Sequence, residues 1–175
     1  MNHSTTDPVE GFPPIAASDA RLLILGSAPS VESLKQQQYY AHPRNSFWSI
    51  VVSLLHPATE ELGYNERTLL LQQNHIALWD VMRSCERPGS LDSAIVAGSI
   101  QTNPFNLFFT KHPEIQALFF NGAKAEETYR KRVLPDINNA HRNLKRFRLP
   151  STSPAMATLN FAEKRGQWRL LLDYC

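Results

Sequence analysis

Residues 21–30, near the start of the chain, read Arg-Leu-Leu-Ile-Leu-Gly-Ser-Ala-Pro-Ser and are the strongest indication of the fold class. The apolar run in its first half has the length and composition of a buried β-strand, and Gly26 ends it. Ser30 is of a residue type that caps helix N-termini, so a short helix is predicted over residues 31–35. A buried strand, a small polar turn and a helix in this order are typical of an α/β fold.

The same alternation of strands and helices continues to the end of the chain. Further strands are predicted at residues 76–79, 115–120 and 145–149. Helices are predicted over residues 46–55, 66–73, 91–96, 104–110, 123–133 and 157–174. Strands that are separated by helices predict a three-layer α/β/α fold with a central, mostly parallel four-stranded sheet.

The first 19 residues differ in character from the rest of the chain. They contain three prolines and no lysine or arginine, and they show no hydrophobic period. We therefore expect an N-terminal arm over residues 1–19, outside the core, and one folded domain over residues 20–175. A chain of 175 residues has the size of a single domain, and it buries a core without disulfides or a structural metal.

The composition excludes several classes of protein. The longest apolar run is about five residues, far short of the roughly 20 needed to span a bilayer, and no signal peptide is visible at the N-terminus. Two cysteines, Cys85 and Cys175, are too few for a disulfide framework or a cysteine-built zinc site. No two of the six histidines have ligand spacing, so no metal is expected. We expect a cytoplasmic protein in a reducing compartment.

Basic side chains are concentrated in one stretch of an otherwise nearly neutral chain. The formal net charge is +2, whereas residues 124–148 carry eight Lys and Arg against three acidic residues, which gives 8 − 3 = +5. A local basic patch is typical of a protein that holds a polyanion on one face. The same stretch is also consistent with a solvated helix face and a charged loop.

Two loops rich in serine and proline follow predicted strands. In an open parallel sheet the loops after the strands meet at one edge, where ligands bind. Hydroxyl groups and backbone N–H groups next to a helix N-terminus form an anion site, although the same serines are typical of simple helix caps. The candidate phosphate-binding residues are Gly26, Ser27, Pro29 and Ser30 in the first loop, and Ser151, Thr152 and Ser153 in the second.

The densest feature of the sequence is the polar and aromatic segment at residues 38–48. Tyr39, Tyr40 and Phe47 are candidates for stacking on a nucleic-acid base. Asn45 carries an amide that can orient water or bind a base edge. The alternative is structural, because Asn45 is also a suitable N-cap for the following helix and Phe47 is expected to be at least partly core.

Several nucleotide and hydrolase motifs are absent. No Walker lysine follows Gly26, no Gly-x-Gly-x-x-Gly is present, and Ser27 does not lie in a Gly-x-Ser-x-Gly elbow. Asp80 follows a predicted strand and is consistent with either a general base or a turn residue.

Together these segments resemble the uracil-DNA glycosylase superfamily and, within it, the DNA-deoxyinosine (hypoxanthine-DNA) glycosylase branch. The resemblance is carried by an ordered set of segments at residues 11–15, 23–30, 38–48, 78–81, 84–87, 89–93, 120–122 and 149–154. The superfamily usually has a catalytic Asp or Asn in the loop after its first strand, and this chain has none there. Met156 is a second departure, at a position where the branch often has Asn.

The resemblance implies a uracil-DNA-glycosylase-like fold and a monofunctional DNA glycosylase of base excision repair. Such an enzyme flips a deaminated base out of DNA, with hypoxanthine the first expectation and uracil the second, and hydrolyses its glycosidic bond without a cofactor or metal. The implied roles are catalysis for Asn45, base contact for Tyr39, Tyr40, Phe47 and Asn121, and site support for His42 and Asp80. The implied partner is DNA that contains a deaminated base, bound by a monomer.

Two other functions remain open at the level of the sequence. One is a catalytically silent nucleic-acid-binding module of the same fold, which the missing acidic residue and Met156 favour. The other is a small-molecule hydrolase of the α/β class that uses Ser27 or Asp80.

Overall fold

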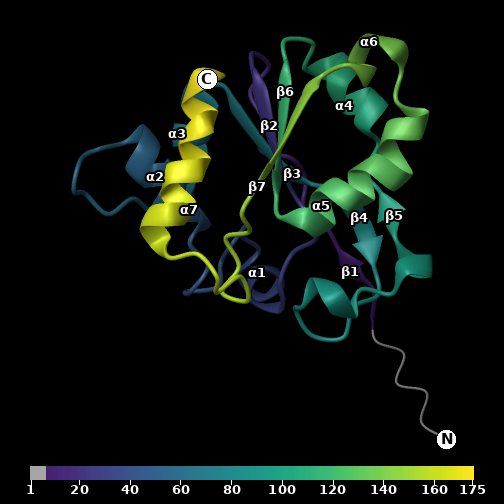
Figure 1. Ribbon diagram of the computed structural model, residues 1–175, viewed down its shortest axis with the longest axis horizontal. Helices are drawn as coiled ribbons and strands as arrows, with labels where there is room; N and C mark the ends of the chain where they lie inside the picture. Colours follow the sequence, from purple (N-terminus) through teal and green to yellow (C-terminus); the bar gives the residue numbers. More distant parts are fainter. Residues whose placement is uncertain (1–6) are drawn as a thin grey trace, which may run out of the picture.

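A four-stranded parallel sheet forms the centre of the molecule (Figure 1). The computed structural model describes residues 7–175. The sheet contains β2 (Leu22–Gly26), β3 (Ile76–Asp80), β6 (Ala117–Asn121) and β7 (Lys145–Leu149), in the order β3-β2-β6-β7, and every neighbouring pair is parallel. The predicted α/β fold with a central parallel sheet is thereby confirmed.

Helices cover both faces of this sheet, because successive side chains of a strand point to opposite faces. Leu22 and Ile24 pack into one cluster with α2 (Phe47–Leu55), α3 (Tyr64–Gln73) and α7 (Phe161–Trp168). Leu23 and Leu25 pack into the other with α4 (Phe105–Lys111) and α5 (Ala123–Thr128). Figure 1 shows these two groups of helices on either side of the strands, which is the predicted three-layer arrangement. The shorter helices are α1 (Val31–Gln36) and α6 (Asn139–Arg142).

A second, smaller sheet was not predicted. It pairs β1 (Val9–Glu10), β4 (Met82–Cys85) and β5 (Gln101–Thr102) in the antiparallel order β1-β4-β5. Its strands have two to four residues, which is too short for a recognisable alternation of polar and apolar residues.

The expected arm is partly integrated into the fold, so the prediction that it lies outside the core is wrong for the part that begins at Val9. Val9 is buried in β1, and Ile15 forms an antiparallel bridge with Leu78 on β3, with N···O distances of 2.9 and 2.8 Å. Because β3 is an edge strand, its unpaired backbone groups accept such a partner. Residues 1–6 of the expected arm lie outside the described residues.

The predicted helices hold with two exceptions. The segment predicted as a helix over residues 91–96 forms only the 3-10 helix η1 (Asp92–Ala94), because Val96 donates its N–H to the Glu86 carbonyl. A second 3-10 helix, η2 (Ala97–Ser99), follows it, and Ser99 Oγ accepts from the Glu86 N–H. The last helix begins only at Phe161 and continues as the 3-10 helix η5 (Arg169–Asp173).

The remaining segments are irregular helical turns. Residues after α5 continue as the π-helix η3 (Tyr129–Val133) and the 3-10 helix η4 (Leu134–Asp136). None of the helices within residues 7–175 combines the length and the apolar content that crossing a membrane requires.

Candidate active site

A cavity of about 360 Å³ opens at the carboxyl ends of the parallel strands, which is where the topology predicts a ligand site. The loops after β2, β6 and β7 gather at this end of the sheet (Figure 1). The lining residues that the sequence had singled out are Gly26, Ser27, Pro29, Ser30, Tyr39, Tyr40, Asn45, Asp80, Asn121, Ser151, Thr152 and Ser153. Segments that are more than a hundred residues apart in sequence thus share one cavity.

The turn after β2 is tightly built around Gly26. A Cβ atom at this position would lie 2.4 Å from Asp80 Oδ1 and 2.7 Å from the Tyr40 hydroxyl, which is closer than atoms can approach. Ser30 caps α1, because its Oγ accepts from the Ser33 N–H at 3.1 Å. Ser27 donates its hydroxyl to Asp92 Oδ1 at 2.7 Å. The hydroxyls of this turn therefore have protein partners in addition to facing the cavity.

The turn after β7 is fixed by Asn121 at the end of β6. The Thr152 N–H donates to Asn121 Oδ1, and Asn121 Nδ2 donates to Thr152 Oγ1, both at 2.9 Å. Thr152 is buried and holds the loop, so the expected phosphate contacts of this turn fall to Ser151 and Ser153. Asn121 keeps one amide hydrogen and one carbonyl lone pair beyond this pairing.

Asn45 lies at the cavity and at the start of α2, one residue before Ser46, which is the N-cap instead of the predicted Asn45. Its Oδ1 accepts from the Phe47 N–H at 3.0 Å, which caps the start of α2. It also lines the cavity and is half-buried. The next residue, Ser46, donates its N–H to the Thr152 carbonyl at 3.0 Å. This bond joins the Asn45 segment to the turn after β7.

Two of the predicted site residues do not line the cavity. Phe47 is fully buried, because it lies on the inner face of α2, and its ring stacks against Tyr40 with centroids 4.2 Å apart. It supports Tyr40 from behind, so its predicted contact with a base is wrong. His42 also lies outside the cavity, and its Nδ1 accepts from the Arg44 N–H at 3.1 Å.

Tyr39 lines the cavity but is largely a structural residue. Its ring is buried, and its hydroxyl donates to the Pro13 carbonyl at 3.0 Å. Its own carbonyl accepts from Trp48 Nε1 at 2.7 Å. These bonds hold the loop that presents Tyr40.

Asp80 is a buried carboxyl group at the end of β3, directly beside Gly26 in the sheet register. Burial raises the pKa of Asp80 to about 7, the nearby Asp92 carboxylate adds to this increase, and the Arg87 guanidinium opposes it. Burial also raises the pKa of the Tyr40 hydroxyl, which therefore stays protonated at neutral pH. The cavity thus holds a carboxyl group that changes charge near neutrality.

Sequence reasoning assigned no role to the segment at residues 90–93, which forms one wall of the cavity. Ser90 Oγ accepts from the Val31 N–H at 2.9 Å, and Asp92 accepts from the Ser27 hydroxyl. This segment therefore packs against the turn after β2. Phe12 and Met156 also line the cavity. Only the resemblance, which includes residues 89–93, signalled this wall.

The arrangement does not favour a serine hydrolase. The Ser27 hydroxyl is bonded to Asp92, and none of the described residues that line the cavity is a histidine. Within residues 7–175, no three His, Cys, Asp or Glu side chains are grouped so as to hold a metal ion.

Comparison with known proteins assigns this architecture to a family. The family model of the uracil DNA glycosylase superfamily matches residues 13–172. The chain belongs to the uracil DNA glycosylase superfamily. A curated relative from Methanosarcina acetivorans, named hypoxanthine DNA glycosylase, is 36% identical over 146 residues, which are 79% of this chain and 91% of that protein. A relative of the same name from Methanosarcina barkeri is 36% identical over 118 residues, which are 67% of this chain and 73% of that protein.

A solved structure agrees with the family assignment. A solution NMR structure of a candidate uracil DNA glycosylase from Methanosarcina acetivorans matches with a TM-score of 0.77 and 32% sequence identity. The match covers 94% of this chain and 96% of that one. In this member of the superfamily the first loop has no carboxylate, yet the cavity contains one, because β3 places Asp80 beside Gly26.

Proposed function

We propose that this protein is a monofunctional DNA glycosylase of base excision repair that releases a deaminated base, with hypoxanthine preferred and uracil second. The observation that carries the proposal is the single cavity that joins Asn45, Asn121 and the two hydroxyl-bearing turns at the carboxyl edge of the sheet. Its volume lies in the range of small-molecule sites. The names of the two Methanosarcina relatives support hypoxanthine as the base.

In this mechanism Asn45 binds and orients the water molecule that attacks the sugar. Because a neutral amide does not deprotonate water in the ground state, its contribution is to orient the water toward C1′ of the flipped nucleotide. The glycosidic bond breaks with oxocarbenium character, as in other glycoside hydrolysis. Most of the acceleration must then come from fixed groups that stabilise the departing base and the sugar cation. Asn121 suits the base edge, because Thr152 holds its amide rigidly.

In this mechanism the turns after β2 and β7 and the basic stretch at residues 124–148 bind the DNA backbone. Ser151 and Ser153 offer hydroxyl groups at the cavity. Arg148 is exposed near the carboxyl end of β7, the edge strand of the sheet that leads into the turn after β7. The proposal includes a monomeric, cytoplasmic enzyme that needs neither cofactor nor metal.

The test of this function is a panel of duplexes that each contain one deaminated base, deoxyinosine, deoxyuridine or deoxyxanthosine. Base release is followed under single-turnover conditions by alkaline cleavage of the abasic product. Release of hypoxanthine is the expected result. Tight DNA binding without release of any base would instead identify a catalytically silent binding module.

The double variant Ser151→Ala/Ser153→Ala is expected to weaken binding to deoxyinosine DNA about a hundredfold. Two hydrogen bonds to the charged phosphate, at about 1.5 kcal/mol or more each, account for this loss. Fluorescence anisotropy at fixed salt measures it. Ser49→Ala, at an exposed serine on α2 outside the cavity, is the matched control. Equal affinity of the double variant and the control would argue against a backbone contact by this turn.

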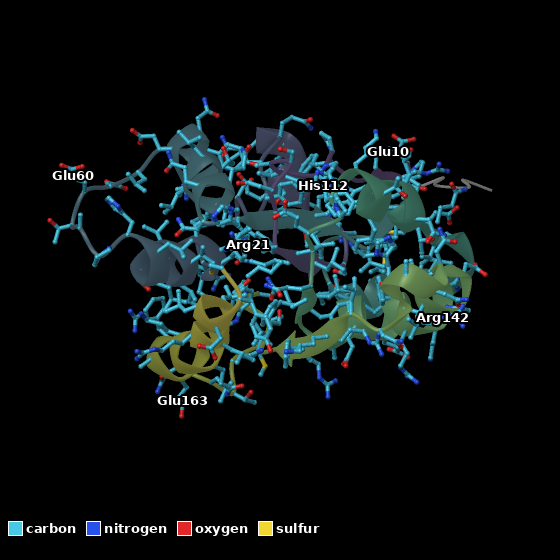
Figure 2. All side chains as sticks on the ribbon, turned by 90° about the horizontal axis from the view of Figure 1, so that it is seen from above. Glu10, Arg21, Glu60, His112, Arg142 and Glu163 are labelled. Atoms are coloured by element: carbon cyan, nitrogen blue, oxygen red, sulfur yellow. The ribbon has the colours of Figure 1, made fainter. Side chains whose placement is uncertain are left out.

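Arg148→Gln is expected to reduce the slope of log affinity against log salt concentration by about 0.9, because one phosphate contact and its counterion are lost. Arg148 is exposed near the end of β7, with its Nε 3.3 Å from Glu126 Oε2. Arg21→Gln removes the same charge at the opposite end of the sheet; Figure 2, seen from above, shows Arg21 over the middle of the molecule. Equal slopes for the two variants would place the DNA elsewhere.

A further inference from the structure

Two buried polar atoms in the cavity, Asp80 Oδ2 and the Tyr40 hydroxyl oxygen, form no hydrogen bond of normal geometry within residues 7–175. The Asn121 side chain lies close enough to the Tyr40 hydroxyl to oppose the increase that burial causes in its pKa, but the Tyr40 O–H has no acceptor among these residues. Asp80 is 3% exposed, and both residues line the cavity. A buried polar group without a partner destabilises the protein, so such groups in an open cavity indicate a ligand that satisfies them.

The two groups converge above one point of the sheet. Asp80 Oδ1 and the Tyr40 oxygen lie 2.4 and 2.7 Å from the position that a Cβ atom of Gly26 would occupy. The ring of Tyr40 is held from behind by Phe47. The backbone of Asp80 is held by Asn103, whose Nδ2 donates to the Asp80 carbonyl at 2.8 Å. Both groups are therefore positioned before any ligand arrives.

Within residues 7–175, no counterion lies at bonding distance from Asp80. Its charged and titratable neighbours are Asp92, Arg87, Tyr39, Tyr40 and Cys85. Arg87 forms no salt bridge with it, because the guanidinium donates to the carbonyls of Gly89 and Pro29 instead. The negative charge of Asp92 also disfavours the ionised form of Asp80.

We propose that Asp80, in its protonated form, and Tyr40 are a pair of hydrogen-bond donors that binds the O6/N7 edge of a 6-oxopurine in the cavity. This inference rests on the proposed glycosylase function and names its substrate class. A protonated carboxyl group and a phenol each offer one O–H, and the O6/N7 edge offers two adjacent acceptors. Both bonds strengthen as negative charge develops on the departing purine. The role requires only hydrogen bonding, with no proton transfer from Asp80.

The same pair explains how a deaminated purine is distinguished from adenine. Adenine carries an amino group, a donor, at the position where hypoxanthine carries O6. Two donors would then face each other in a buried site, and one would stay unpaired. A site that hydrogen-bonds one substrate group has a much lower kcat/KM for an analogue that cannot form that bond.

The sign of the pH dependence follows from the donor role. Since only protonated Asp80 donates, release is expected at pH values below the pKa of about 7 and is lost above it. For one titrating group, the single-turnover rate on deoxyinosine DNA should fall about tenfold between pH 6 and pH 8. Asp80→Asn keeps an N–H donor that does not titrate, so its rate should change less than twofold over this range. Asp136→Asn, at an exposed carboxylate outside the cavity, should retain the wild-type profile.

The outcomes separate this inference from the proposed function. If the wild type releases hypoxanthine but Asp80→Asn keeps the wild-type fall, or is folded and inactive at both pH values, the donor role is overturned and the glycosylase function stands. If no base is released from any duplex at either pH, both are overturned. Thermal unfolding checks that each variant is folded. Should Asp80→Asn not fold, Tyr40→Phe decides: we expect at least a tenfold lower rate with an unchanged pH profile, and an unchanged rate overturns the pair.

Discussion

Asn45→Ala is expected to reduce the single-turnover rate of base release by a hundredfold or more, because the attacking water loses the group that orients it. DNA binding should be retained, because the two turns and the basic stretch are intact. Release is measured on deoxyinosine duplexes and binding by anisotropy on the same DNA. Release at the wild-type rate would remove Asn45 from the mechanism.

The capping bond of Asn45 requires a control, because loss of an N-cap costs about 0.5–2 kcal/mol of stability. Asn45→Ser keeps an oxygen that accepts from the Phe47 N–H but lacks the amide. We expect Asn45→Ser to unfold at nearly the wild-type temperature and to be as inactive as Asn45→Ala. Activity that follows the unfolding temperature across the two variants would mean that Asn45 acts only through the helix.

Gly26→Ala is expected to abolish base release and to lower the free energy of unfolding by about 1–3 kcal/mol, the usual cost of an overpacked core. The added methyl group would overlap Asp80 Oδ1 and the Tyr40 hydroxyl at 2.4 and 2.7 Å, so both side chains must move. Gly26 itself is buried at the end of β2. A single methyl group should therefore disrupt the part of the cavity that we assign to the base.

Gly98→Ala is the matched control for this substitution, because a Cβ atom at Gly98 has nothing within 4 Å. Single-turnover release and thermal unfolding of the two variants are compared. We expect wild-type behaviour for Gly98→Ala. If Gly26→Ala also behaves as the wild type, the close approach of Asp80 and Tyr40 to this glycine is not important for activity.

The central sheet was predictable because each of its buried strands is a short apolar segment set off from helices by polar residues. Residues 21–25 and 76–79 differ from the observed strands by at most one residue at either end. The small antiparallel sheet was not predictable, because Val9–Glu10 and Gln101–Thr102 are too short to show a period. The helix predicted over residues 91–96 is wrong because Val96 bonds to Glu86 and Asp92 bonds to Ser27, and both partners lie outside the segment.

The candidate site, like the fold, could be predicted only in part from the sequence. The sequence indicated the residue types and, through the resemblance, the segments that carry them. It did not distinguish Tyr40, which faces the cavity, from Phe47, which stacks behind it. Nor did it show that Thr152 is hydrogen-bonded to Asn121, or that Asp80 has no counterion at bonding distance in the part of the chain that the structure describes. These features depend on contacts between side chains that are distant in sequence and meet across the sheet or the cavity.

The alternation of strands and helices, and therefore the sheet edge at which the polar turns meet, could be predicted from the residues alone, because both follow from local period and from the geometry of parallel strands. The convergence of Asp80 and Tyr40 above Gly26, and the lack of a hydrogen-bond acceptor for them among residues 7–175, became visible in the folded structure. Burial and missing partners arise from contacts between β2, β3 and the loop after α1. Such contacts bring together residues far apart in the chain, and no local pattern records them.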